Sequence, residues 1–106
     1  MVERVRYRII EKDGLETVQE IHKIVVHKFT VGDVDDPEIY AAEPIWQWQK
    51  SDAGKFIMEN AIEPPSYHRH MDISVYGYRY AIVAELEKKK LSEFYLRWGK
   101  NGNHQS

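Results

Sequence analysis

The chain opens with apolar and basic residues in strict alternation. Residues 3–10 place arginines between apolar side chains, in the order Arg4, Val5, Arg6, Tyr7, Arg8 and Ile9. A period of two predicts a strand with one buried and one solvated face. The dipeptide Asp13-Gly14 follows and is typical of a tight hairpin turn.

A second apolar stretch, residues 15–31, is predicted to return as the partner strand. Seventeen residues are long for one strand, so we expect a bulge or break near residues 20–23. A helix over residues 15–25 is the alternative, because Val18, Ile21 and Val25 also fit a helical period.

The middle of the chain predicts two helices. Asp36-Pro37-Glu38 is a helix start, with Asp36 expected to cap the free amides of a helix over residues 37–50. Pro44 is expected to break or kink that helix. Ser51 is expected to cap a second, short helix over residues 52–61 that buries apolar side chains such as Phe56 and Ile57.

The last third predicts a second hairpin. Residues 66–74 are expected to form a loop, and residues 75–86 alternate as a strand whose one face carries Tyr76, Tyr78, Tyr80, Ile82, Ala84 and Leu86. Three lysines, Lys88–Lys90, are expected to form a solvated turn. Residues 92–98 are predicted to return as a strand with Phe94, Leu96 and Trp98 inward.

These elements predict an α+β fold. The order β-β-α-α-β-β gives an antiparallel sheet of about four strands, made of two hairpins, with the helices packed on one face. The chain of 106 residues has room for a single domain, predicted over residues 1–99, and residues 100–106 are expected to form a flexible polar tail.

Charge and composition narrow the functional classes. Lys and Arg number 15 and Asp and Glu 17, a formal net charge of −2, so nucleic acid is an unfavoured partner and no membrane partner is expected. No cysteine is present, which excludes disulfides and thiolate chemistry and favours a reducing cytoplasm.

A longer series of residues is distinctive. Residues 34–44 are followed by Trp46-x-Trp48-x-x-Ser51-x-x-Gly54-x-Phe56, then by residues 64–68, Tyr76-Gly77-Tyr78 and Leu96-Arg97-Trp98-Gly99. This series resembles short uncharacterised proteins of T4-like tailed bacteriophages, including phages of marine cyanobacteria. The resemblance covers residues 29–99 and implies no catalytic residue. It implies a phage product in the cytoplasm of an infected bacterial host, or one associated with the virion.

His68, His70 and Asp72 form the densest group of metal-capable residues. In an extended segment they would project to one side, as a facial metal site requires. Because the segment follows two prolines and is expected to be a loop, local hydrogen bonding explains these residues better. We therefore predict no metal and no other cofactor.

The strand of tyrosines has two interpretations. Exposed Tyr76, Tyr78 and Tyr80 would resemble the aromatic strand of RNA-recognition domains, on which bases stack. The same face continues into apolar residues, which favours a core or a subunit interface. Trp46 and Trp48 lie two positions apart in a predicted helix and cannot enter the same core, so one of them is expected to face a partner.

The sequence therefore favours a non-enzymatic protein that acts through protein–protein contact. The expected partner is a second copy, in a homodimer, or else a host or phage protein, with Trp46, Trp48, Tyr76 and Tyr78 as candidate interface residues. One alternative is a small-ligand binder or enzyme with a pocket between sheet and helices. Its candidate lining residues are His68, His70, Tyr78 and Tyr80. The other is a binder of single-stranded nucleic acid.

Overall fold

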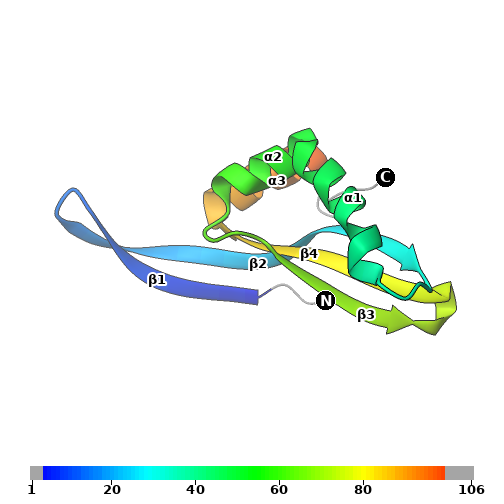
Figure 1. Cartoon of the computed structure of the whole chain (residues 1–106). Helices are drawn as coiled ribbons and strands as arrows, with labels where there is room; N and C mark the ends of the chain where they lie inside the picture. Colours follow the sequence, from blue (N-terminus) through cyan, green and yellow to red (C-terminus); the bar gives the residue numbers. More distant parts are fainter. Residues whose placement is uncertain (1–3, 100–106) are drawn as a thin grey trace.

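The computed structural model describes residues 4–99 as a four-stranded antiparallel sheet with helices on one of its faces (Figure 1). The elements are, in chain order, β1 (Arg4–Lys12), β2 (Leu15–Gly32), α1 (Pro37–Lys50), α2 (Asp52–Asn60), β3 (Ser66–Asp72), the 3-10 turn η1 (Ile73–Val75), β4 (Gly77–Glu87) and α3 (Lys88–Trp98). The strand order is β1-β2-β4-β3. The predicted α+β class, with two hairpins and helices on one face, is confirmed. The predicted tail, residues 100–106, lies outside the described residues.

The first hairpin has the predicted turn. Asp13 and Gly14 both have positive φ, 55° and 79°, which is the backbone that a two-residue hairpin needs. Strand β2 is extended over its whole length, so the helical alternative for residues 15–25 is wrong. The irregularity lies between Val25 and His27 rather than near residues 20–23.

The two middle helices meet at a close contact. Helix α1 continues through Pro44 instead of breaking there, and the Asp36 side chain makes no capping hydrogen bond. Ser51 does cap α2, because its Oγ accepts a hydrogen bond from the Gly54 amide at 3.0 Å. A Cβ at position 54 would lie 1.7 Å from the carbonyl oxygen of Trp48, so only glycine allows this turn between the helices.

The second hairpin uses other segments than predicted. Residues 66–72 form strand β3, which pairs with β4 from Ser66↔Val83 to Asp72↔Gly77. The segment, predicted to be a loop that follows two prolines, is an edge strand with six of its seven residues exposed. Backbone hydrogen bonds to β4, rather than apolar burial, hold it in the sheet.

The C-terminal segment is a helix and not a strand. Helix α3 begins at Lys88, so the predicted lysine turn is the first turn of the helix. Leu91, Phe94 and Trp98 follow the spacing i, i+3, i+7 and face the core. Leu96 was expected to point inward, but it is 88% exposed, because a helix turns residues 94 and 96 to opposite sides.

The core lies between the sheet and the helices. Its largest cluster joins β2 and β4 to all three helices and consists of Ile24, Val26, Trp48, Phe56, Ile57, Ile82, Ala84, Leu86, Leu91 and Phe94. A smaller cluster of Val31, Ala41 and Tyr80 extends it toward the start of α1. Both clusters lie over the half of the sheet that the helices cover (Figure 1).

Candidate functional site

The β1–β2 hairpin projects from the body of the molecule as a two-stranded arm. Pairing between β2 and β4 ends at Ile21↔Glu87, so residues 7–20 have only each other as sheet neighbours, and residues 4–6 join them to the body by pairing with residues 21–23. We call residues 4–20 the arm. It accounts for the elongated shape, 53 × 22 × 21 Å, and Figure 1 shows it extending away from the helices.

One face of the arm is apolar and uncovered. Val5, Tyr7, Ile9 and Val18 are 45%, 64%, 69% and 68% exposed. The register places them on the face that the helices cover further along the sheet, since Val5 pairs with His22 and His22 with Leu86 of the core. The arm thus continues the apolar sheet face beyond the end of its helical cover.

The opposite face of the arm is mostly polar, with Ile10 and Leu15 as its apolar members, and it is tied to the body. The Arg6 guanidinium donates to both carboxylate oxygens of Glu85, at 2.8 and 3.0 Å, across strand β2. This hydrogen bond lowers the pKa of Glu85 and raises the pKa of Arg6. Ile21, the residue of β2 that pairs with Arg6, is fully buried.

The two ends of the apolar arm face carry opposite charge. At the tip, Glu11 and Glu16 are directly opposite each other in the register, and neither forms an ion pair with a residue between 4 and 99. At the base, helix α3 begins with Lys88–Lys90, and the Lys88 ammonium lies 3.9 Å from a Glu20 carboxylate oxygen. Like charges opposite each other are unfavourable, so the tip is suited to a basic partner.

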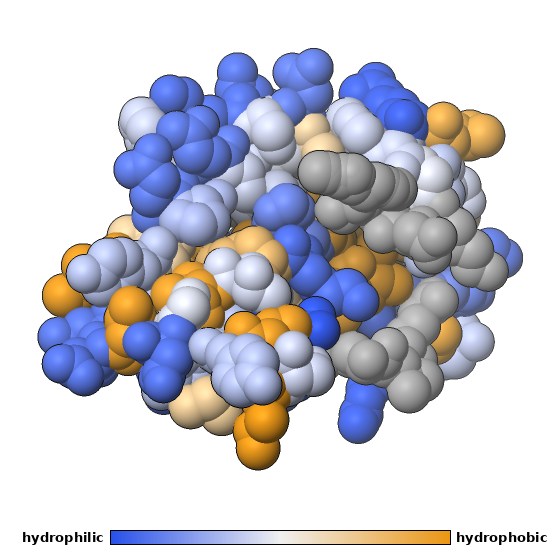
Figure 2. Space-filling view, turned by 90° about the vertical axis from the view of Figure 1, so that its right-hand side faces the viewer, coloured by the Kyte–Doolittle hydropathy of each residue, from blue (hydrophilic) through white to orange (hydrophobic). Residues whose placement is uncertain are grey.

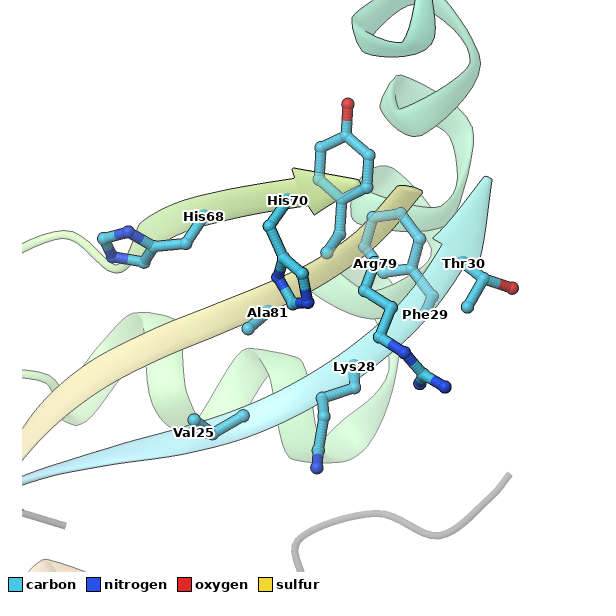
Figure 3. A pocket seen from close by; sticks show the side chains of 9 residues that line it. Val25, Lys28, Phe29, Thr30, His68, His70, Arg79 and Ala81 are labelled. Atoms are coloured by element: carbon cyan, nitrogen blue, oxygen red, sulfur yellow. The ribbon is translucent and has the colours of Figure 1, made fainter. Parts of the chain in front are cut away.

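A second feature, a pocket of about 570 Å³, lies on the sheet face away from the helices. It is lined by Val25, Lys28, Phe29, Thr30, His68, His70, Arg79, Tyr80 and Ala81. Figure 3 shows His70, Arg79 and Lys28 projecting to one side of the sheet and Phe29 to the other. We call this feature the open-face pocket.

Arg79 is held in place at the rim of the open-face pocket. Its Nε donates to Asp72, which also accepts hydrogen bonds from the Ser74 amide at 2.9 Å and the Ser74 hydroxyl at 2.7 Å. The hydrogen bonds from Ser74 and then from Arg79 lower the pKa of Asp72 from 3.8 to about 2. Asp72 therefore stays ionised and fixes the guanidinium from one side.

Three of the four residues predicted to line a ligand pocket do line one. His68, His70 and Tyr80 line the open-face pocket, which lies on the far side of the sheet and not between sheet and helices. Tyr78 does not line it: its ring faces the helix side, with the Arg69 guanidinium 5.1 Å from its centroid. Lys28, Thr30 and Arg79 had not been predicted, since polar and charged residues in a strand also fit a plain solvated face.

The tyrosines do not form an exposed ladder. Tyr80 is 5% exposed and stacks on Phe29 with ring centroids 5.0 Å apart, so it cannot stack on a base. Tyr76 lies outside β4 in a left-handed conformation, φ 52°, and is 80% exposed. It directly precedes Gly77, which pairs with Gly32 at the end of β2 opposite the arm. At this end of the molecule Figure 2 shows apolar groups interrupted by polar ones.

The two tryptophans separate as the helical period requires. Trp48 is buried in the core, 5% exposed, and Trp46 is 52% exposed with the Lys50 ammonium 3.8 Å from its ring centroid. Trp46 is a single exposed ring, whereas the arm presents four apolar side chains. The arm was not predicted from the sequence. The strand predicted over residues 15–31 is much longer than the helices that could cover it, and this difference in length indicates an uncovered end.

His68, His70 and Asp72 do not assemble into a metal site. No group of three metal-ligating side chains is arranged to hold an ion anywhere between residues 4 and 99. Asp72 is engaged with Arg79, and His68 Nε2 lies 3.0 Å from the Ser66 hydroxyl. Among the described helices none is both long and apolar enough to cross a membrane.

Comparisons of the chain with protein-family models, with curated proteins and with solved structures found no match.

Proposed function

We propose that this protein acts through protein–protein contact and that the apolar faces of two arms pack together in a homodimer. The observation that carries this proposal is the uncovered apolar row of Val5, Tyr7, Ile9 and Val18 on a two-stranded ribbon. The proposal concerns contact rather than catalysis.

The apolar face of such an arm is expected to pack against another protein surface. A two-stranded hairpin alone is marginally stable in water, and contiguous exposed apolar side chains mark contact surfaces. Full burial of an aliphatic side chain such as Ile9 or Val18 stabilises by about 1.5–3 kcal/mol. Burying the row on both partners therefore gives a driving force that the separate chains lack.

Charge complementarity favours a second copy as the cover. If two arms pack face to face in antiparallel directions, the tip of each arm reaches the base of the other. Glu11 and Glu16 of one copy then meet Lys88–Lys90 of the other, twice over by symmetry. Each lysine cluster would relieve the repulsion between the paired glutamates at the opposing tip.

The middle of the arm falls on the symmetry axis in this arrangement. Ile9 and Val18 pair with each other about halfway between the tip at Asp13-Gly14 and the base at Ile21. Each therefore meets its own copy across the interface. A charge introduced there would be placed beside an identical charge.

We also propose a cellular setting for the protein. The resemblance to proteins of T4-like phages supports a role inside an infected bacterial cell or in the virion. The alternative is that a host or phage protein, and not a second copy, packs on the apolar face of the arm. The following experiment separates the two.

Sedimentation velocity of the full chain tests the proposal. The wild type is expected to sediment as a dimer, at twice the chain mass of 12.6 kDa, at high micromolar concentration. Ile9→Glu is expected to sediment as a monomer, because two carboxylates would meet at the axis. Leu15→Glu is the matched control: Leu15 is 70% exposed, as Ile9 is 69%, but lies on the other face of the arm.

A dimeric Leu15→Glu beside a monomeric Ile9→Glu supports the proposal. A wild type that stays monomeric up to high micromolar concentration contradicts it and leaves the arm to a different protein. Equal dissociation by both variants also contradicts it, because the effect would then not depend on the apolar face.

A further inference from the structure

We propose that the open-face pocket binds the phosphate group of a small organic phosphate. The pocket lies on the sheet face away from the helices, whereas the apolar row of the arm continues the helix-covered face. This inference therefore does not depend on the arm's partner.

Two rows of residues across the sheet build the pocket. In the register of β2, β4 and β3, one row is Lys28, Ala81 and His68, and the next is Thr30, Arg79 and His70. Neighbouring strands lie about 4.8 Å apart, so the outer members of a row face each other over the central one. Alanine at the centre of the first row leaves a hollow between Lys28 and His68.

The hollow is ringed by cations and hydrogen-bond donors. Lys28 is exposed and forms no ion pair with any residue between 4 and 99. Arg79 uses its Nε on Asp72, which leaves its two terminal amino groups for a ligand. Figure 3 shows Lys28, Arg79 and His70 directed to the same side of the sheet.

This set of donors suits a phosphate dianion. An ammonium, a guanidinium and a hydroxyl are the donors that recur around bound phosphate, and charge-assisted hydrogen bonds of this kind are among the strongest in proteins. The imidazoles of His68 and His70 add two further possible donors. Asp72, the carboxylate that holds Arg79 at the rim, is already neutralised by Arg79 and held by Ser74.

The size and the apolar part of the pocket indicate an organic ligand. A volume of about 570 Å³ exceeds what inorganic phosphate fills and falls within the range of small-molecule sites. Val25 and Ala81 offer apolar surface beside the cations. A phosphate monoester with a compact apolar body matches both parts.

Titration with phenyl phosphate, followed by calorimetry and by the NMR signals of the histidine rings, tests the inference. Saturable binding is expected with shifts at His68 and His70. Arg79→Gln and Lys28→Gln are each expected to weaken binding by about tenfold, the scale of one charge-assisted hydrogen bond. Lys55→Gln removes an exposed lysine on the helix side and is expected to change affinity less than about twofold.

A second variant separates shape from charge. Ala81→Leu fills the hollow without altering any charge, and it is expected to abolish saturable binding while the fold, checked by circular dichroism, is kept. Phenol is expected not to bind, and inorganic phosphate to bind more weakly than phenyl phosphate. Non-saturable binding, or equal losses in Lys55→Gln and Arg79→Gln, would overturn the inference, because both indicate general attraction to surface charge.

Discussion

Strand β2 has two halves with the same kind of sequence and opposite environments. Val18 and Val26 are both valines on the helix-side face of this one strand, yet Val18 is 68% exposed and Val26 is 2% exposed. The half that contains Val26 lies under the helices, whereas the half that contains Val18 belongs to the arm. Alternation of apolar residues thus predicts a face that can be buried, and tertiary cover decides whether the chain itself buries it.

This difference in cover distinguishes the arm from the body of the molecule. In the body, the apolar face packs against aromatic side chains such as Phe56 and Phe94, whose ring centroids lie 6.2 Å apart. On the arm the same face meets solvent. When one chain leaves part of its apolar sheet face uncovered, a second chain can pack on that part.

The largest effect is expected in the body of the molecule. Ile82→Ala removes a fully buried side chain from the centre of β4 and should lower the free energy of unfolding by about 2–5 kcal/mol. Leu96→Ala on α3 should change it by less than about 0.5 kcal/mol, because Leu96 is 88% exposed. Urea unfolding measures both, and a large loss in Leu96→Ala would contradict the helical assignment of residues 88–98.

The matched valines test the comparison itself. Val26→Ala should cost about 2 kcal/mol, since two carbon atoms are removed from a packed core. Val18→Ala should stay within about 0.5 kcal/mol of the wild type, at concentrations low enough for the monomer to predominate. Equal losses in dilute urea titrations would show that the arm has a cover within its own chain.

The smallest effect on the free energy of unfolding is expected at acidic pH. The pKa of Asp72 is lowered to about 2 in the folded chain, so its contribution to stability is complete above its ordinary value of 3.8 and is lost as the pH falls toward 2. Asp72→Asn should therefore flatten the stability of the protein between pH 4 and pH 2. An unchanged slope over that window, in unfolding titrations at several pH values, would show that the carboxylate is not held by Ser74 and Arg79.

Much of the fold was predictable from the sequence because burial leaves a periodic trace. The alternation in β1, β2 and β4 identified three strands, and Ser51 marked the start of α2. Strand β3 was missed because an edge strand of polar residues carries no hydrophobic period. The segment of α3 was predicted to be a strand because Phe94, Leu96 and Trp98 alternate, although Leu91, Phe94 and Trp98 also fit a helical period.

The candidate sites were less predictable, for a different physical reason. His68 and His70 were recognised as chemistry-bearing residues, but the pocket also needs Lys28 and Arg79, which reach it only through the pairing of three strands. The predicted interface residues were Trp46, Trp48, Tyr76 and Tyr78, whereas the exposed apolar row lies on the arm. Neither placement follows from local pattern, because the pocket depends on strand pairing and the exposed row depends on where the helices end along the sheet.

A charge-swap experiment tests the antiparallel packing of two arms most directly. One variant, Glu11→Lys with Glu16→Lys, has basic charge at both tip and base, and the other, Lys89→Glu with Lys90→Glu, has acidic charge at both. Each variant alone should sediment as a monomer of about 12.6 kDa, and an equimolar mixture should form a dimer, because each tip then meets a base of opposite charge. Two variants that each dimerise as the wild type does, or a mixture that stays monomeric, would contradict the account.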